Sequence, residues 1–209
     1  MNAVAAGGTG TSPSGLTFDA EKHEYRLDGK VIPSVTQVLS PLYSWDHINP
    51  EVLRQKAELG TSVHYACELD NHGNLDESSV HEKVAGYLEG WRLFKREMKP
   101  EILLNEKRLY HPTRGYAGTL DLNLRMQGRL WLTDLKASVA LYPQVGVQLA
   151  AYEDLLRVTY PELKREPILR AALQLKPNGT YKLGTFTNPG DLATFYGLLA
   201  VHHWRKNHG

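Results

Sequence analysis

The sequence predicts an α/β domain in which a mixed central β-sheet is flanked by helices. Two helical patterns come before Pro100, and three consecutive β-prone segments follow it. Another helical pattern separates these segments from a strand pair, and one more helix follows that pair. Strands that are partly consecutive and partly separated by helices are typical of a mixed sheet covered on its faces. A chain of 209 residues, 42% of them hydrophobic, is long enough to bury one core of this kind.

The N-terminal part of the chain has the weakest pattern. Residues 1–15 are rich in small residues, Gly, Ser and Thr, so we expect a disordered tail followed by a single domain over 16–209. The Asp28-Gly29 pair lies between two short β-prone runs and predicts a hairpin, which would be an N-terminal extension of the domain. A short helix or turn region, broken by Pro41, comes next.

The later elements follow from hydrophobic periodicity and from residues that end helices or begin turns. Asn49-Pro50 is typical of a helix start, and Gly115, Gln127-Gly128 and Pro177-Asn178-Gly179 are typical of turns. The predicted elements are a helix that begins at Pro50, a helix over Val80–Met98, strands over Glu101–Tyr110, Tyr116–Leu124 and Arg129–Lys136, a helix over Pro143–Val158, strands over Ile168–Lys176 and Thr180–Thr187, and a last helix that begins near Pro189.

The composition excludes several classes of site. Cys67 is the single cysteine, which excludes an internal disulfide, a four-cysteine zinc site and a cysteine-ligated iron–sulfur cluster. The N-terminus lacks the basic region and apolar run of a signal peptide, and no window has the ~20 apolar residues of a membrane span. We therefore expect a soluble, cytoplasmic protein with no membrane partner. The net charge of +1 and pI of about 7.9 neither favour nor exclude a nucleic-acid partner.

The strongest chemical signal lies on two neighbouring predicted strands. Asp121 lies inside the second strand of the group of three, and Asp134 and Lys136 end the third. Strand alternation places Asp134 and Lys136 on the same face, and a hairpin between the two strands can bring Asp121 beside Asp134. The sequence therefore predicts two carboxylates and one ammonium group at one end of a sheet.

This combination suits hydrolysis of a phosphodiester. Hard oxygen ligands select Mg²⁺ or Mn²⁺, and such a metal polarises a phosphoryl oxygen and neutralises charge that develops in the transition state. Lys136 would orient the attacking water or stabilise the added negative charge. A D-x-K triplet also occurs by chance where the aspartate is only a turn residue, but a buried aspartate between leucines, such as Asp121, needs a partner or a metal.

Four motifs in order give a more specific indication. The segment resembles the nuclease core of the PD-(D/E)XK superfamily, in particular its RecB-like branch, whose motifs are an upstream G-x-x-x-H, then G-x-x-D, (D/E)-x-K and Q-x-x-x-Y. The first 25 or so residues of the predicted domain also resemble the start of phage-encoded members and of mitochondrial genome maintenance exonucleases. The matching positions here are Gly60 and His64, Gly118 and Asp121, Asp134 and Lys136, and Gln148 and Tyr152.

The resemblance implies a restriction-endonuclease-like core and a role for each matched residue. It implies that Asp121 and Asp134 bind the metal with His64 as a further ligand, and that Asp121, Asp134 and Lys136 are catalytic. Gln148 and Tyr152 would support the site or contact DNA, and Glu106 lies where several members have an acidic residue, although this match is loose.

Structural alternatives exist for the helical residues. His64 could be a satisfied histidine on a helix face, Gln148 and Tyr152 could only pack or cap, and Glu68 could join the metal site or only pair with His64.

From the resemblance we expect a metal-dependent exonuclease that acts on DNA ends in phage-type recombination, repair or replication, in the cytoplasm of a host cell if phage-encoded. A recombination or replication protein is a possible partner. The alternatives are a structure-specific endonuclease, a non-catalytic DNA-binding module and an adaptor on a nuclease fold. Candidate DNA contacts are Arg108, His111, Arg114, Lys176, Lys182, Tyr43 and Trp45, each of which could equally be a solvated charge or a core aromatic.

Overall fold

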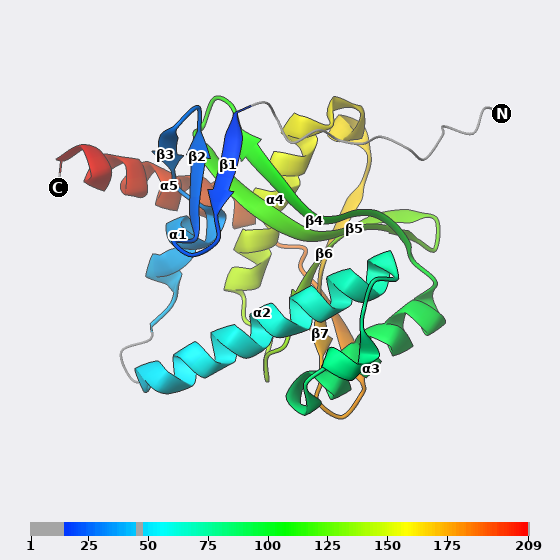
Figure 1. Ribbon diagram of the computed structural model, residues 1–209. Helices are drawn as coiled ribbons and strands as arrows, with labels where there is room; N and C mark the ends of the chain where they lie inside the picture. Colours follow the sequence, from blue (N-terminus) through cyan, green and yellow to red (C-terminus); the bar gives the residue numbers. More distant parts are fainter. Residues whose placement is uncertain (1–14, 45–47, 209) are drawn as a thin grey trace.

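A five-stranded mixed sheet forms the centre of the protein (Figure 1). The computed structural model describes residues 15–44 and 48–208, so the predicted tail up to residue 14 and Trp45 lie outside the described residues. Strands β6 and β7 are parallel and the other neighbours are antiparallel, which confirms the predicted α/β class and mixed sheet. In sheet order the strands are β4 (Glu101–His111), β5 (Tyr116–Met126), β6 (Arg129–Lys136), β7 (Ile168–Leu175) and β8 (Tyr181–Thr185).

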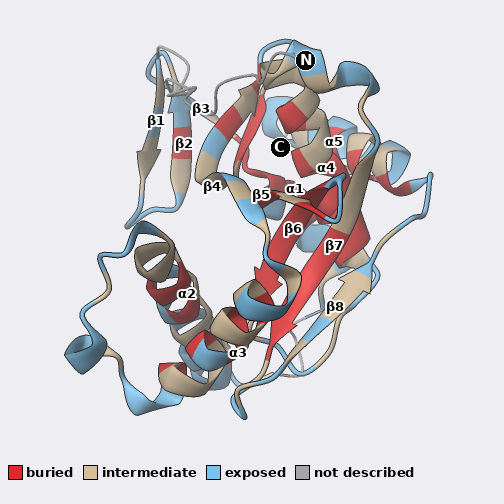
Figure 2. Cartoon of the chain, turned by 90° about the vertical axis from the view of Figure 1, so that its right-hand side faces the viewer, coloured by how far each residue is buried: buried red, intermediate tan, exposed pale blue. Residues whose placement is uncertain are grey.

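Helices cover both faces of this sheet, and each face has its own apolar core. On one face, α2 (Pro50–His72) and α3 (Glu82–Met98) pack on the sheet through residues such as Val63, Trp91 and Phe94. On the other face lie α1 (Val35–Leu39), α4 (Gln144–Thr159) and α5 (Asp191–His208). Figure 2 shows β6 and β7 as mostly buried strands between the two helical layers.

A separate three-stranded antiparallel sheet precedes the helices. It consists of β1 (Leu16–Asp19), β2 (Glu24–Leu27) and β3 (Lys30–Ile32), and its second turn is the predicted Asp28-Gly29 pair, both residues with positive φ. The amide of Ala117 donates a hydrogen bond to the carbonyl of Pro33 at 2.9 Å, which ties the end of this small sheet to β5. Short 3₁₀ turns complete the chain at Ser40–Leu42, Glu77–Ser79 and Pro161–Arg165.

The helix bounds differ from the predicted ones mainly at caps. Helix α2 continues to His72 and ends where Gly73 adopts the left-handed conformation. Helix α3 begins at Glu82 because the His81 side chain accepts a hydrogen bond from the amide of Lys83. The last helix begins at Asp191, after a turn in which the Asn188 side chain accepts from the amide of Gly190.

Strands β4 and β5 extend beyond β6. β4 and β5 stay paired as far as His111 and Tyr116, whereas the β5–β6 ladder ends at the pair Leu122 and Thr133. The outer part of β5 then packs on the other helical layer, since Tyr116 and Leu120 belong to the core of α1, α4 and α5. The strands β5 and β6 therefore separate between Leu122 and Asp121 of β5.

A buried arginine joins three elements behind the sheet. Arg170 of β7, whose side chain is 11% exposed, forms an ion pair with Asp191 of α5 (3.2 Å) and lies 3.6 Å from Glu153 of α4. Its guanidinium also donates to the carbonyl of Asn188 at 2.9 Å. These contacts hold the start of α5 against α4 and β7.

We expect replacement of Arg170 by methionine to lower the free energy of unfolding by about 3 kcal/mol, because Asp191 would remain as an unpaired buried charge. Urea denaturation would measure the change. The control is Arg165→Met at an exposed position, expected to change stability by less than about 0.5 kcal/mol. Equal stability of the Arg170 variant and the wild type would show that this ion pair has no net stabilising role.

No helix within residues 15–44 and 48–208 combines the length and the apolar character needed to cross a membrane.

Candidate active site

The site is built around the fork between β5 and β6. Continuation of the β5–β6 register beyond Leu122 and Thr133 places Asp121 opposite Asp134. There the strands part, and the Asp121 side chain takes the place of a backbone partner: its Oδ2 accepts from the amide of Leu135 at 2.7 Å. Asp121 is 8% exposed and Asp134 is 3% exposed, so the two carboxylates are held in a largely buried position.

His64 of α2 contacts the backbone of the same residue, Leu135. Its Nε2 lies 3.0 Å from the carbonyl oxygen of Leu135. A carbonyl oxygen only accepts hydrogen bonds, so Nε2 carries the proton. The other ring nitrogen, Nδ1, therefore faces Glu106 Oε1 at 3.4 Å and Asp121 Oδ2 at 3.7 Å.

Glu106 enters the site from β4 through an unusual backbone. The β4–β5 register places it opposite Asp121, and it has a positive φ of 46° inside a strand. This left-handed conformation is rare for a residue other than glycine, and such strain is concentrated at functional sites. His64, Glu106 and Asp121 each offer one ligand atom within 4.8 Å of the others.

Lys136 is held beside this group by a chain of polar contacts. Its Nζ lies 2.6 Å from Asp134 Oδ2 and donates to Gln148 Oε1 at 3.1 Å. The amide nitrogen of Gln148 in turn lies 3.3 Å from the hydroxyl of Tyr152. Gln148 and Tyr152 are both buried on α4, so they fix the position of the lysine instead of presenting a surface to a ligand.

The electrostatics of the site are dominated by three carboxyl groups in a buried place. Burial raises the pKa of Asp121 to about 7, and the nearby Asp134 and Glu106 act in the same direction. Burial alone would lower the pKa of His64, but the charges of Asp121 and Glu106 outweigh it and raise the pKa to about 9. The same competition raises the pKa of Lys136, where burial is outweighed by Asp134 and Asp121. The carboxylates of Asp121 and Glu106 thus face the imidazole of His64, and that of Asp134 faces the ammonium group of Lys136.

Two observations show that the residues fit a divalent cation. With Nε2 bound to a carbonyl, Nδ1 of His64 is the nitrogen left for a metal, an arrangement in which the second ring nitrogen sets ligand orientation. The buried Oδ2 of Asp134 forms a close ion pair with Lys136 but has no hydrogen-bond donor of good geometry among the described residues. The carboxylate oxygens of this donor set suit Mg²⁺ or Mn²⁺, whereas an imidazole nitrogen is a ligand that transition metals prefer.

The structure brings together His64, Asp121, Asp134, Lys136, Gln148 and Tyr152, but it groups them differently from the expected ligand set. The predicted ligands were His64, Asp121 and Asp134, with Glu106 as a loose match. In the structure Glu106 joins His64 and Asp121, whereas Asp134 lies outside this group and contacts Lys136. Glu68, four residues after His64 on α2, is not a member of the group either.

The motif glycine before Asp121 has a packing role. A Cβ built on Gly118 would lie 2.6 Å from Cε1 of Tyr152 and 3.2 Å from Cγ2 of Val35. The Tyr152 ring therefore packs directly on the β5 backbone.

We expect Gly118→Ala to lower the free energy of unfolding by about 1–3 kcal/mol, because the buried Tyr152 ring must shift. Urea denaturation would measure this loss. Gly60→Ala in α2 is the matched control, since a Cβ there meets nothing within 4 Å and alanine favours the helix by up to about 1 kcal/mol. A Gly118 variant as stable as the wild type would contradict the packing role.

Three of the seven candidate DNA contacts, His111, Arg108 and Arg114, have partners within the protein. His111 is buried, with Nε2 3.5 Å from Asp154, and its Nδ1 accepts from turn amides. Arg108 lies over the Phe18 ring at 5.0 Å, and Arg114 lies over the Tyr196 ring at 3.7 Å. Lys176 and Lys182 lie on the β7–β8 hairpin. None of these contacts excludes a bound phosphate, but none points to one.

Two further tyrosines belong to the surroundings of the site and were not in the predicted metal or catalytic set. Tyr25 of β2 is 3% exposed, its hydroxyl is 2.6 Å from Thr119 Oγ1, and burial raises its pKa with further contributions from Glu106 and Asp121. Tyr43, which the sequence suggested only as a stacking surface, is close enough to Lys136 and Asp134 for both charges to affect its pKa, which burial raises. The N-terminal segment thus forms one wall of the site.

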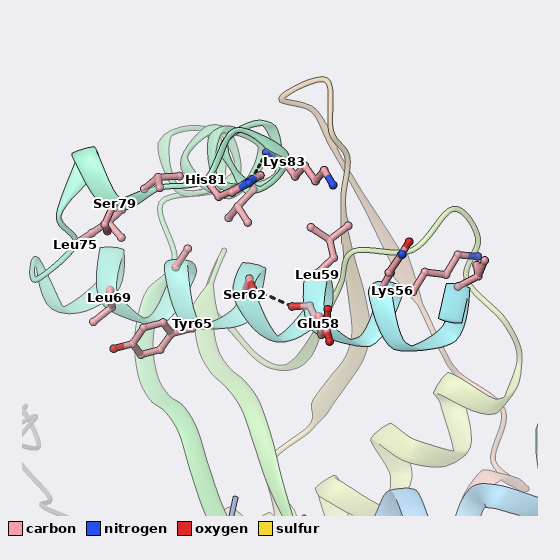
Figure 3. Close-up of a pocket in the computed structure, with 15 residues that line it drawn as sticks. Lys56, Glu58, Leu59, Ser62, Tyr65, Leu69, Leu75, Ser79, His81 and Lys83 are labelled. Carbon is pink, nitrogen blue, oxygen red and sulfur yellow. Dashed lines mark hydrogen bonds between the residues drawn. The ribbon is translucent and has the colours of Figure 1, made fainter. Parts of the chain in front are cut away.

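A surface pocket lies elsewhere on the protein. A cavity of about 800 Å³ lies between α2 and the start of α3 and is lined by residues such as Leu59, Leu69 and Val84, with Lys56 and Lys83 at its edge (Figure 3). None of His64, Glu106, Asp121, Asp134 or Lys136 lines it. The buried charges therefore lie outside this pocket.

No protein-family model matches the chain, and a comparison with curated proteins finds no similar sequence. The assignment of a function to this protein therefore rests on the site geometry and on the four motifs.

Proposed function

We propose that this protein is a divalent-metal-dependent deoxyribonuclease of the RecB-like type, an exonuclease that acts on DNA ends. The observation that carries the proposal is the group formed by His64 Nδ1, Glu106 and Asp121, beside the ion pair of Asp134 and Lys136. A purely structural ion pair would not need three carboxyl groups and a histidine at one fork of the sheet. Such charge gathered in a buried place is typical of functional sites.

Each part of the site has a distinct role in this proposal. His64, Glu106 and Asp121 would hold a Mg²⁺ or Mn²⁺ ion, and Asp134 would be a further carboxylate next to it. When bound, the ion supplies charge stabilisation at the phosphoryl oxygens. Lys136, positioned by Gln148 and Asp134, would donate a hydrogen bond to the attacking water or to a phosphoryl oxygen.

The fold and the motif order support the proposal. The sheet β4–β8, with α4 between the parallel strands β6 and β7, is proposed to be a PD-(D/E)XK core. The four motifs lie on α2, β5, β6 and α4, and their side chains converge at one place. The phage-type role in recombination, repair or replication rests on the resemblance alone.

The test is cleavage of end-labelled linear DNA, single- and double-stranded, beside closed circular DNA, with Mg²⁺, Mn²⁺ or EDTA. The proposal predicts metal-dependent loss of linear DNA while circles stay intact, and the label that disappears first gives the polarity. Cutting of circles would replace the exonuclease by an endonuclease. Binding of DNA without cleavage by well-folded protein would refute the catalytic proposal and favour a binding module.

A further inference from the structure

The loop over 137–143 connects the two elements that carry the catalytic proposal. It leaves β6 directly after Lys136 and leads into α4, which carries Gln148 (Figure 1). Val139 is 96% exposed and Tyr142 is 57% exposed, although both are large apolar residues. Isolated exposed apolar residues are common on protein surfaces, so the position of this pair beside the site is what requires an explanation.

The backbone of the loop is anchored near both of its ends. Gln174 donates from Nε2 to the carbonyl of Ser138 at 2.6 Å. Leu141 packs against the core of the α4 face, and its Cδ1 would lie 2.7 Å from a Cβ on Gly184. The carbonyl of Tyr142 accepts from the amide of Val145 at 3.0 Å as α4 begins. Leu141 thus serves the fold, while Val139 and Tyr142 on either side of it do not.

The chemistry of the loop selects one kind of ligand group. Residues 137–143 contain no Lys, Arg, Asp or Glu, so the loop offers no charge to a phosphate. An exposed tyrosine ring and a neighbouring valine are suited to the flat face of a nucleobase. In a duplex these faces are covered by stacking on the neighbouring base pairs, whereas in a single strand they are accessible.

We propose that Val139 and Tyr142 form a stacking surface for unpaired bases of the substrate strand next to the candidate active site. This inference rests on the proposed nuclease function and makes it more specific: the preferred substrate near the cleavage point is single-stranded. The bases are held by the loop after β6, while the backbone phosphate reaches Lys136 three residues earlier.

The test is fluorescence anisotropy of a labelled oligothymidylate in EDTA, where hydrolysis is absent. The double variant Val139→Ser, Tyr142→Ser is expected to bind the strand about tenfold more weakly than the wild type, in line with the loss of about one stacked base. Tyr142→Phe should keep wild-type affinity, and a duplex of the same length should bind both proteins within about twofold.

A matched control exists on α5. Val201 and Trp204 have the same spacing as Val139 and Tyr142 and are 46% and 63% exposed. The variant Val201→Ser, Trp204→Ser should leave affinity for the strand unchanged. A strand of abasic sites should bind the wild type as weakly as thymidylate binds the loop variant, because the stacking groups are missing from the ligand instead of the protein.

Several outcomes would overturn the inference. These are no strand binding by the wild type, equal affinity of the wild type and the loop variant for thymidylate, an equal loss in the α5 control, or an abasic strand that the wild type binds as tightly as thymidylate. A dimer that the loop variant dissociates, with strand affinity unchanged, would show that a second copy covers the loop. The assay needs no hydrolysis, so the two proposals fail in different ways. Base-dependent strand binding by a protein that cleaves no DNA would refute the nuclease function alone. Equal strand affinity of the loop variant and the wild type, in a protein that does cleave DNA, would refute the inference alone.

Discussion

Replacement of Asp121 by asparagine is expected to lower the rate of DNA hydrolysis by about a thousandfold or more, because an acidic metal ligand would be lost and with it several kcal/mol of transition-state stabilisation. Asp121 belongs to the group with His64 and Glu106, and it also accepts a hydrogen bond from the amide of Leu135 where β5 and β6 separate. Mn²⁺ binding, measured by calorimetry, should weaken in parallel.

The same substitution should leave the fold intact. Asparagine can still accept the hydrogen bond from the amide of Leu135 through its side-chain oxygen, and it removes a negative charge from a buried place beside Glu106 and Asp134. The thermal unfolding midpoint of Asp121→Asn should therefore be close to that of the metal-free wild type. Asp76→Asn, at an exposed turn, is the control for activity. Hydrolysis by Asp121→Asn at the wild-type rate would contradict the assignment of this residue.

Replacement of Lys136 by alanine has the second largest expected effect, a loss of about a hundredfold to a thousandfold in the hydrolysis rate. Lys136 is held by Asp134 and Gln148, so its ammonium group is oriented before substrate binds. Because Lys136 is not a ligand in the proposed site, Mn²⁺ affinity should be retained or increased, since a nearby positive charge is removed.

The difference between these two variants separates their roles. Loss of hydrolysis with Mn²⁺ binding intact is expected for Lys136→Ala, and loss of both is expected for Asp121→Asn. Lys164→Ala, at an exposed position of the 3₁₀ turn Pro161–Arg165, should change neither quantity. Full activity of Lys136→Ala would show that this lysine only neutralises Asp134.

Much of the fold could be predicted from local patterns. The order of helices and strands from Pro50 onwards agrees with the predicted order, because long amphipathic helices and alternating strands give strong periodic signals. The Gln127-Gly128 turn has positive φ at both residues, as a two-residue hairpin turn requires. The packed face of α2 could not be predicted from the sequence. Ala57, Gly60 and His64 recur at the spacing of one helix face, yet the buried residues are Val63, Ala66 and Cys67.

The site could be predicted in part, for a physical reason. Motif spacing identified His64, Asp121, Asp134 and Lys136, and strand alternation predicted that the last two share a face. The membership of Glu106 depends on the length of the β4–β5 turn, which sets the register, and on its left-handed backbone. The position of Asp134 outside the His64 group depends on where β5 leaves β6, and no local pattern reports that point.

The most direct test of the central claim is the position of Mn²⁺ in crystals of this protein, located by its anomalous scattering. The account predicts a peak bounded by His64 Nδ1, Glu106 and Asp121, with Lys136 outside the coordination shell. A peak at another place, or no peak at this group in crystals of a protein that cleaves DNA with Mn²⁺, would contradict it.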